Sequence, residues 1–268
     1  MLIIGEKINA TSKRVAEAIV NKDAASIQEL ARQQVEAGAD YIDVNAGTGQ
    51  GIDQEITDLK WAIDVVQQAV DAPLCLDSSD PQALAAAAAH YAGSELIINS
   101  VNAEKERLDP IGRVAAERVA GVIALVMGEG GIPRTVDERV AAADLIMNHL
   151  KQLGVKQDQV YFDPLVLPIS VDTEQGLVTL QTIEQIKSRY PSAKTVVGLS
   201  NISYGLPQRG IINRAFLLMA AAVGLDAAIL DPTDVRMMSM ARVSDMLTGK
   251  DPACKGFIKA HRKGMLAE

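Results

Sequence analysis

Short apolar runs rich in β-branched residues recur along the chain, and each run stops abruptly at a polar residue. Continuous apolar runs, as opposed to strict alternation of apolar and polar positions, are typical of parallel strands that are buried on both faces. The pattern therefore predicts eight strands, at residues 2–6, 41–45, 74–78, 96–100, 122–127, 160–164, 195–201 and 227–231.

Segments with apolar residues at three- and four-residue spacing separate the predicted strands, which is the pattern of amphipathic helices. Several of these segments carry terminal signals: Gly38 is a C-terminal stop, Asp80 precedes a proline, and Thr135 with Glu138 forms a capping-box pattern. The spacing predicts helices over 24–37, 53–70, 81–90, 104–118, 135–152, 173–189, 211–223 and 234–247.

Strand and helix thus alternate along the chain. From Glu6 to Asp231 the intervals between strand ends average about 32 residues, which is the length of a βα unit. Eight such units within 268 residues predict an α/β fold of the (β/α)8 TIM barrel type. We expect a single barrel domain over residues 1–268, with a short C-terminal helical extension from about residue 248.

An open, doubly wound parallel sheet is the main alternative to the barrel. Such a sheet rarely uses eight parallel strands without a long insertion or a glycine-rich phosphate loop. Residues 47–51 are the one candidate for that loop, but their glycines do not follow the GxGxxG spacing. We interpret them as an ordinary βα loop and favour the barrel.

Composition narrows the classes of function. The chain is 48% hydrophobic and 22% charged, as in a globular protein, and its formal net charge of −8 argues against non-specific binding to nucleic acid or an anionic membrane. The apolar stretch at the N-terminus is too short for a secretory signal or a membrane span, so we expect a cytoplasmic protein. Two cysteines and three histidines form no metal-ligand spacing, so no protein-bound metal is expected.

Polar residues that close the predicted strands are the candidate site, because barrel enzymes build their active sites at the C-terminal ends of the strands. The set contains no histidine, cysteine or lysine, which argues against metal-dependent hydrolysis and against Schiff-base chemistry. The strand-closing residues are Glu6, Asn45, Asp77, Asn99, Met127, Asp163, Asn201 and Asp231.

Four of these side chains, Asp77, Asn99, Asp163 and Asn201, are predicted to point into one barrel mouth. A carboxylate can accept two N–H donors from an amino-pyrimidinone edge, and an asparagine can donate or accept. The set therefore favours recognition of a heterocycle rich in donors and acceptors. Any single Asp or Asn here could instead cap the following helix, and Asp231 before a proline is the clearest candidate for a plain turn residue.

Eight motifs in the chain resemble those of the methyltetrahydrofolate:corrinoid protein methyltransferases, in order and over nearly the whole length. That family belongs to the pterin-binding barrels, whose other well-known branch is dihydropteroate synthase. The motifs are GEKIN (5–9), DVNAG (43–47), LCLDS (74–78), INSVNAE (98–104), FDPLVLP (162–168), GLSNIS (198–203), INRAFL (212–217) and GLDAAILD (224–231).

The resemblance implies a role for each polar residue in the mouth. Asp163 would hold the 2-amino and N3–H edge of the pterin, and Asp77 and Asn99 would reach its N1 and N8 side. Asn201 would turn toward N5 when the methyl donor binds, so Asn201, Asp163 and Asp77 are the implied catalytic set.

The resemblance also implies the remaining walls of the pocket. Met127, Gly198 and Ser200 would line it near the ring, and Arg209 would lie near the p-aminobenzoate portion of the folate. The chain departs from the family pattern at Tyr204 and the glycine after it, where relatives often have amides, so its contacts to the folate tail are expected to differ.

The implied reaction moves a methyl group between N5 of methyltetrahydrofolate and the cobalt of a corrinoid, with Co(I) cobalamin as the nucleophile. An N5 amide anion is a poor leaving group, so protonation of N5 or a strengthened hydrogen bond to it should assist the displacement, with the proton drawn from solvent through the Asn201, Asp163 and Asp77 network. One barrel fills this length, so the corrinoid is expected on a separate protein. A corrinoid iron–sulfur protein and an O-demethylase corrinoid protein both fit, the direction of transfer is open, and a homodimer is implied.

Two alternatives stay open at this point. Dihydropteroate synthase would use Asp77, Asn99 and Asp163 in the same way, but it also needs a lysine on the seventh strand and an arginine–histidine pair near the eighth, where this chain has GLSNIS and ILDPTD. A non-catalytic pterin-binding subunit would be favoured by loss of Asn201 or Asp163, and both are present.

Overall fold

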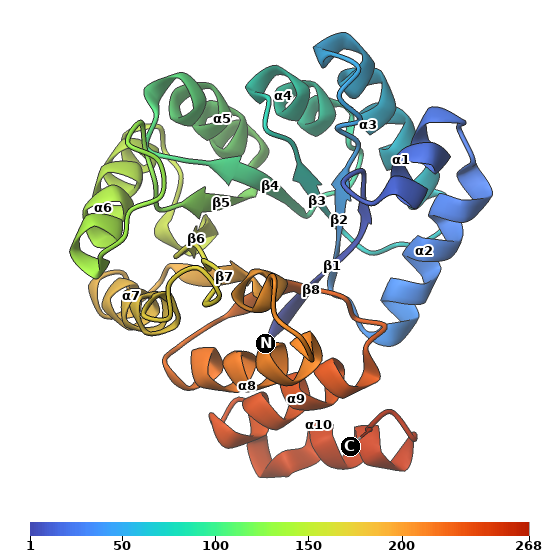
Figure 1. Cartoon of the computed structure of the whole chain (residues 1–268). Helices are drawn as coiled ribbons and strands as arrows, with labels where there is room; N and C mark the ends of the chain where they lie inside the picture. Colours follow the sequence, from blue (N-terminus) through green and yellow to red (C-terminus); the bar gives the residue numbers. More distant parts are fainter. Residues whose placement is uncertain (268) are drawn as a thin grey trace.

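The computed structural model describes residues 1–267 and forms a closed barrel of eight parallel strands in chain order. Figure 1 shows the strands in the centre and the helices around them as an outer ring. The strands are β1 (Leu2–Asn9), β2 (Tyr41–Asn45), β3 (Leu74–Asp77), β4 (Leu96–Val101), β5 (Gly121–Leu125), β6 (Val160–Asp163), β7 (Lys194–Gly198) and β8 (Ala227–Leu230).

Closure of the sheet confirms the predicted (β/α)8 barrel and excludes the open sheet. Ile4 of β1 pairs with Tyr41 of β2 on one side and with Ile229 of β8 on the other, so the first and last strands share a ladder. An open sheet would leave both of these strands with a free edge.

The helices follow the predicted order, with one addition. Ten helices lie within residues 1–267: α1 (Lys13–Val20), α2 (Ala24–Ala37), α3 (Ile52–Gln67), α4 (Pro81–His90), α5 (Lys105–Arg118), α6 (Val136–Gln152), α7 (Gln175–Arg189), α8 (Arg209–Ala222), α9 (Val235–Leu247) and α10 (Lys255–Arg262). α1 lies outside the predicted set because its two turns are shorter than the helices usually assigned from sequence, although its buried residues Val15, Ala18 and Ile19 have helical spacing.

The predicted helix ends are confirmed where a specific cap is present. Gly38 ends α2 in the left-handed region, with φ of 104°, which a residue with a Cβ adopts only at a cost. The Asp80 side chain accepts hydrogen bonds from the first backbone N–H groups of α4, and Thr135 and Glu138 form a complete capping box at α6.

Three strand ends, those of β1, β5 and β7, differ from the prediction in a way that matters for the site. β1 continues past Glu6 to Asn9, because its ladder with β2 contains an irregularity between Gly5 and Ile8 and then resumes. Glu6 therefore lies within a strand.

At the fifth strand the ladder stops at Leu125, so Met127 lies beyond the strand end. The seventh strand stops at Gly198, and the short 3-10 helix η2 (Leu199–Ser203) follows and carries Asn201. Met127 therefore lies in the loop after β5, and Asn201 lies on η2, so neither residue closes a strand.

An apolar layer fills the lower part of the barrel interior. It consists of inward-pointing side chains from seven strands, Ile4, Cys75, Ile97, Ile123, Tyr161, Val196 and Ala227. The carboxyl ends of the strands stand in register above this layer, so that Asn45 pairs with Asp77 and Asp77 with Asn99. The layer closes the barrel from below, and the polar side chains gather at one end.

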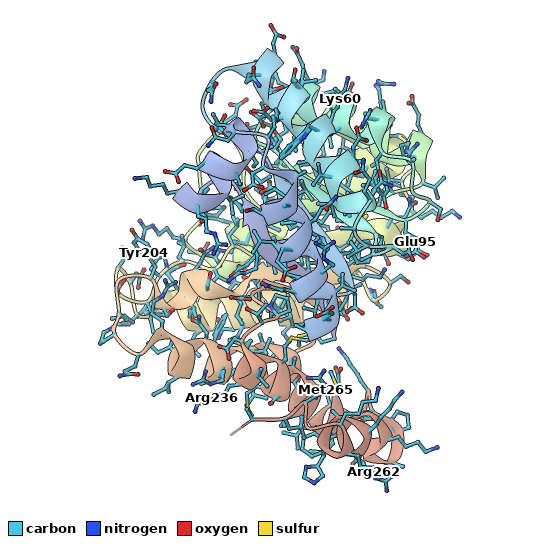
Figure 2. The ribbon with its side chains drawn as sticks, turned by 90° about the vertical axis from the view of Figure 1, so that its right-hand side faces the viewer. Lys60, Glu95, Tyr204, Arg236, Arg262 and Met265 are labelled. Atoms are coloured by element: carbon cyan, nitrogen blue, oxygen red, sulfur yellow. The ribbon has the colours of Figure 1, made fainter. Side chains whose placement is uncertain are left out.

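The chain beyond residue 248 contains a short 3-10 helix, η3 (Pro252–Cys254), and α10. α10 packs against α9 and projects from the barrel, as Figure 2 shows around the labelled Arg262. Within residues 1–267, no helix is both long and apolar enough to cross a membrane.

Candidate active site

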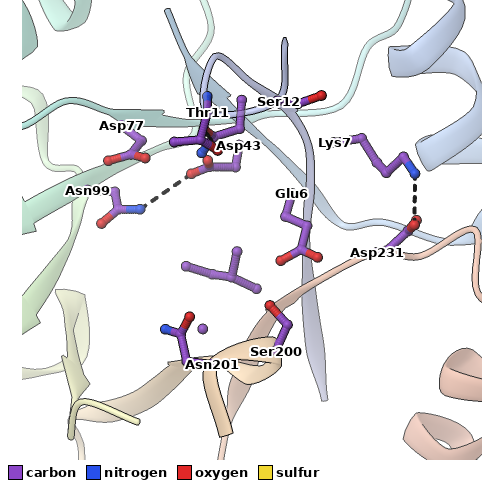
Figure 3. A pocket seen from close by; sticks show the side chains of 13 residues that line it. Glu6, Lys7, Thr11, Ser12, Asp43, Asp77, Asn99, Ser200, Asn201 and Asp231 are labelled. Atoms are coloured by element: carbon purple, nitrogen blue, oxygen red, sulfur yellow. Dashed lines mark hydrogen bonds and ion pairs between the residues drawn. The ribbon is translucent and has the colours of Figure 1, made fainter. Parts of the chain in front are cut away.

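A polar cavity of about 500 Å³ occupies the carboxyl end of the barrel (Figure 3). Its walls come from β1, β2, β3, β4, β8 and the β7–η2 segment. The lining residues are Glu6, Lys7, Asn9, Thr11, Ser12, Asp43, Asp77, Asn99, Gly198, Ser200, Asn201, Ile229 and Asp231. Five of the predicted site residues, Asp77, Asn99, Gly198, Ser200 and Asn201, are therefore brought together in this cavity.

Asp77 and Asn99 stand side by side at the ends of neighbouring strands, and each takes part in a separate hydrogen bond. Asn45 Nδ2 donates to Asp77 Oδ2 at 3.0 Å, and Asn99 Nδ2 donates to Asp43 Oδ1 at 3.4 Å. Burial raises the pKa of Asp77. This wall thus offers both donors and acceptors to a ligand.

Asp163 lies at the end of β6 with only 9% of its surface exposed, and it is outside the set of residues that line the cavity. Its Oδ1 accepts a hydrogen bond from Leu165 N at 2.8 Å. Burial raises the pKa of Asp163 to about 6, although this hydrogen bond and the charge of Arg139 favour the carboxylate. The carboxylate form predominates at neutral pH and is held ready to accept hydrogen bonds.

Arg139 is the buried cation behind Asp163. Its side chain is fully buried and donates to Pro164 O at 2.9 Å and to Gln175 Oε1 at 2.7 Å. These neutral acceptors satisfy the guanidinium without an ion pair, so its charge acts on Asp163 through space.

Asn201 projects from η2 into the cavity, as Figure 3 shows. No side chain or backbone group within residues 1–267 forms a hydrogen bond with its amide. A Cβ built on Gly198 would approach Asn201 Nδ2 to 3.2 Å, so glycine at that position gives the amide room to rotate. The amide is free to pair with a ligand.

Arg209 and Met127 are outside the set that lines the cavity. Arg209 Nη2 donates to Ser200 O at 2.6 Å and its Nε donates to Ser203 Oγ at 3.0 Å, so the guanidinium braces the turn that carries Asn201. The backbone of Met127 accepts a hydrogen bond from Ala103 N at 2.8 Å and ties two loops together. Their predicted contacts to a ligand remain predictions.

Asp231 forms the predicted turn, but it also has a partner outside the turn. Its Oδ1 does accept from Thr233 N at 2.9 Å, as in a turn, but its Oδ2 accepts from Lys7 Nζ at 2.8 Å, and the residue lines the cavity. This ion pair joins the ends of β1 and β8, a contact that the order of the strands explains only once the barrel is closed.

Asp43 is a further cavity residue that the strand-end rule does not find. It lies inside β2, is 2% exposed, and faces Asp77 and the thiol of Cys75. Burial and the neighbouring charge of Asp77 raise the pKa of Asp43 well above its usual range. The sequence does contain a signal for Asp43, which is a charged residue in the middle of the apolar run YIDVN. A strand that is buried on both faces rarely contains a charged residue without a functional or structural partner.

The cavity therefore combines carboxyl groups whose pKa values are shifted in opposite directions with amide groups, of which that of Asn201 has no hydrogen-bond partner within residues 1–267. No group of three or more His, Cys, Asp or Glu side chains suited to a metal ion occurs in the part of the chain that the structure describes. A flat ligand with several ring N–H and N groups matches this arrangement of donors and acceptors.

Comparison with known sequences gives matches over most of the chain. The model of the pterin-binding enzyme family matches residues 5–231. The chain is 37% identical over 268 residues to the methylcorrinoid:tetrahydrofolate methyltransferase of Eubacterium limosum, a match that covers 99% of this chain and 98% of that protein. It is also 31% identical over 249 residues to the methionine synthase of Mycobacterium leprae, covering 88% of this chain and 20% of that much longer protein.

Solved structures with the same fold have little sequence in common with the chain. A Yersinia pestis DHPS with a pterine-sulfa conjugate has a TM-score of 0.67 at 14% identity, over 95% of this chain and 94% of that one. A Coxiella burnetii dihydropteroate synthase in complex with pteroic acid has a TM-score of 0.69 at 13% identity, over 93% and 94% of the two chains. At these identities the likeness shows the fold alone.

Proposed function

Because the chain belongs to the family of pterin-binding enzymes, we propose that it is a methyltransferase that moves a methyl group between N5 of methyltetrahydrofolate and the corrinoid of a separate protein. The observation that carries this assignment is the 37% identity to a methylcorrinoid:tetrahydrofolate methyltransferase over almost the full length of both proteins. The polar cavity at the barrel mouth supports it, because its groups suit a pterin.

In the proposed complex the pterin lies across the barrel mouth. Asp163 accepts hydrogen bonds from the 2-amino group and N3–H, and its pKa of about 6 leaves it a carboxylate at neutral pH. Asp77 and Asn99 take the N1 and N8 side from neighbouring strands. The pterin ring would therefore be held by three strands, with its methyl group toward the open end of the barrel.

Asn201 is the residue we assign to N5. A methylamine is a poor methyl donor, because the amide anion that would leave is strongly basic. A hydrogen bond that strengthens as the C–N bond breaks stabilises the transition state more than the bound substrate. The free amide of Asn201 and the room beside Gly198 suit this role.

The methyl acceptor or donor is a corrinoid carried by a partner protein, either a corrinoid iron–sulfur protein or the corrinoid protein of an O-demethylase system. The cobalt is a substrate of the reaction and is not held by this chain. The transfer is reversible, so the concentrations and identities of the partners set its direction.

A dihydropteroate synthase reaction has less support. The lysine that this reaction needs on the seventh strand would have to reach the cavity, whereas Lys194 stands at the start of β7, at the opposite end of the barrel. Its Nζ donates to Tyr161 Oη at 2.9 Å in the apolar layer. No observation favours that reaction over methyl transfer.

Methyl transfer can be tested directly with free cobalamin as the second substrate. We expect the protein to accelerate methylation of Co(I) cobalamin by methyltetrahydrofolate, followed by loss of the Co(I) absorbance, in proportion to protein concentration. The reverse reaction, from methylcobalamin to tetrahydrofolate, should also be accelerated. Methyltetrahydrofolate binding without any transfer would instead indicate a non-catalytic subunit, and absence of both would contradict the assignment.

We also propose that the protein is a homodimer that uses the α7–α8 face. This face consists of Ile211, Ala215 and Met219, exposed at four-residue spacing on α8, and Leu177 on α7. An apolar groove of about 380 Å³ separates the two helices, which are neighbours in Figure 1. Each copy carries both projecting side chains and a groove, and a two-fold dimer requires such a self-complementary surface.

Met219→Glu is expected to convert the dimer into a monomer, because it places a charge in the apolar face that the dimer would bury. Light scattering after gel filtration should give twice the 28.6 kDa chain mass for the parent and the single mass for the variant. Leu145→Glu is the matched control, since Leu145 is 64% exposed on α6 and outside this face. A monomeric parent protein would rule out the dimer.

A cytoplasmic location belongs to the same proposal. Cys75 and Cys254 are both free thiols, which is usual in a reducing compartment.

A further inference from the structure

Glu6 is a carboxyl group of the cavity that no other part of the described chain engages. Figure 3 shows it on β1 with its carboxylate directed across the cavity toward Ser200 and Asn201. Within residues 1–267 it has no hydrogen bond and no ion pair, because Lys7 beside it is held by Asp231 at 2.8 Å. A carboxyl group placed in this way is available to a ligand.

Charged groups from four parts of the chain surround Glu6. They are Asp231 directly after β8, Lys7 from β1, Arg209 from α8 and Asp43 from β2. Burial and the negative charge of Asp231 raise the pKa of Glu6 to about 7, against the opposing charges of Lys7 and Arg209. Near neutral pH the group therefore exists in both forms and can give or take a proton.

The proposed pterin orientation determines which edge of the ring faces Glu6. The bicycle has its amino group and N3 at one end, N1 and N8 along one long side, and the C4 carbonyl and N5 along the other. When the end of the pterin with the amino group and N3 lies at β6, and the N1 and N8 side lies at β3 and β4, the N5 side faces β7, β8 and β1. Glu6 comes from β1, and Asn201 comes from η2 directly after β7.

We propose that Glu6 is the acid that supplies the proton gained by N5 as the methyl group leaves. The inference rests on the proposed function. The electron pair of Co(I) forms the new bond to the methyl carbon, the pair of the C–N bond stays on N5, and N5 takes the proton of the Glu6 carboxyl group. Co(I) is oxidised to Co(III), the carboxylate is reprotonated from solvent through the mouth, and the reverse transfer returns the proton to Glu6.

Glu6 and Asn201 thus have different roles at N5. An asparagine amide can orient N5 or a bound water, but it holds no proton that it can lose at neutral pH. Glu6 can lose one, and its carboxylate faces Asn201 across the cavity. The pair would together provide the hydrogen bond and the proton.

Glu6→Gln separates the proton from the shape of the side chain. At pH 7 we expect the single-turnover rate of methyl transfer from methyltetrahydrofolate to Co(I) cobalamin to fall about 10²-fold, with the affinity for methyltetrahydrofolate unchanged within about threefold. The parent rate should fall as pH rises through about 7, because the acid form is needed, and the variant should lack this limb. Formate should partly restore the rate of Glu6→Ala.

Glu95→Gln is the matched control, since Figure 2 shows Glu95 on the opposite side of the barrel from Tyr204. An unchanged rate and pH profile in Glu6→Gln would overturn the inference and leave the proposed function standing. Lost methyltetrahydrofolate affinity with an unchanged pH limb would also overturn it, because Glu6 would then be only a binding group. A parent protein that neither binds nor demethylates methyltetrahydrofolate would instead refute the proposed function itself.

Discussion

Asp163→Asn is expected to weaken methyltetrahydrofolate binding about 10²- to 10³-fold. The variant keeps a carbonyl oxygen that can accept from Leu165 N, so the loop after β6 has what it needs to fold. It replaces the other acceptor with an N–H₂ group, which would face the N–H donors of the pterin. The loss of a charge-assisted hydrogen bond to the pterin, together with a buried donor left unpaired, accounts for a decrease in affinity of this size. Isothermal titration measures it.

The same substitution should stabilise the protein without ligand. The pKa of Asp163 in the folded protein, about 6, is above its ordinary value of 3.8, so folding favours the protonated acid and stability falls as pH rises between these values. Asparagine carries no such penalty, and the gain at pH 8 is about 3 kcal/mol for a difference of about two pKa units. Urea unfolding at pH 8 and pH 5 should show a larger gain at pH 8.

Asp71→Asn is the control for both measurements, because Asp71 is exposed in the loop before β3. Unchanged folate affinity in Asp163→Asn would contradict the assigned pterin site. A variant with lower stability than the parent at pH 8 would show that Asp163 contributes to folding more than its burial costs.

Asn201→Ala is expected to slow methyl transfer about 10²-fold or more, and to weaken methyltetrahydrofolate binding less than tenfold. The amide has no hydrogen-bond partner within residues 1–267, so its removal leaves no buried group unpaired in the protein. Loss of one donor that acts mainly in the transition state costs a factor of this order. Single-turnover stopped-flow kinetics with Co(I) cobalamin, together with titration of methyltetrahydrofolate, separates the two effects.

Asn148→Ala, on the exposed side of α6, is the control for Asn201→Ala. Equal single-turnover rates for the parent and Asn201→Ala would remove Asn201 from the mechanism. An equal loss of affinity and of rate constant per bound complex would make it a general binding group.

The fold was predictable because every strand is buried on both faces and every crossover is an amphipathic helix. Each βα unit thus shows its own pattern locally, and Gly38 and Asp80 mark helix ends that the structure confirms. The irregular segments were less predictable. The run TVVGLSN predicts a strand through residue 201, but after Gly198 the chain turns into η2, which Arg209 braces from a later helix.

The residues of the candidate site also differ in how predictable they were from the sequence. Strand ends are visible in sequence, so Asp77, Asn99 and Asn201 were expected in the mouth, and they line the cavity. The search for polar residues at strand ends does not find Asp43, because this residue lies inside β2 and reaches the cavity from below. The family resemblance rested on motifs spread over the chain and is confirmed by the match to the pterin-binding family over residues 5–231.

Asp231 shows why local pattern alone was insufficient. Its partner Lys7 is 224 residues away in the sequence, so no short motif contains both. The same holds for Glu6, because the charge that helps raise its pKa comes from Asp231, directly after the last strand. Contacts of this range follow from barrel closure and are visible only in the structure.

The pairing of β1 with β8, which closes the barrel, has a consequence for how the chain folds during its synthesis. β1 is translated first, but its ladder partner β8 and the partner of Lys7 are translated more than 200 residues later. Contacts of such long range are slow to form, because the chain must close a large loop before they contribute. In a nascent chain on the ribosome, the cavity at the barrel mouth is therefore completed last. A polypeptide that stops short of residue 231 would carry most of the pterin-binding side chains and still lack a finished wall.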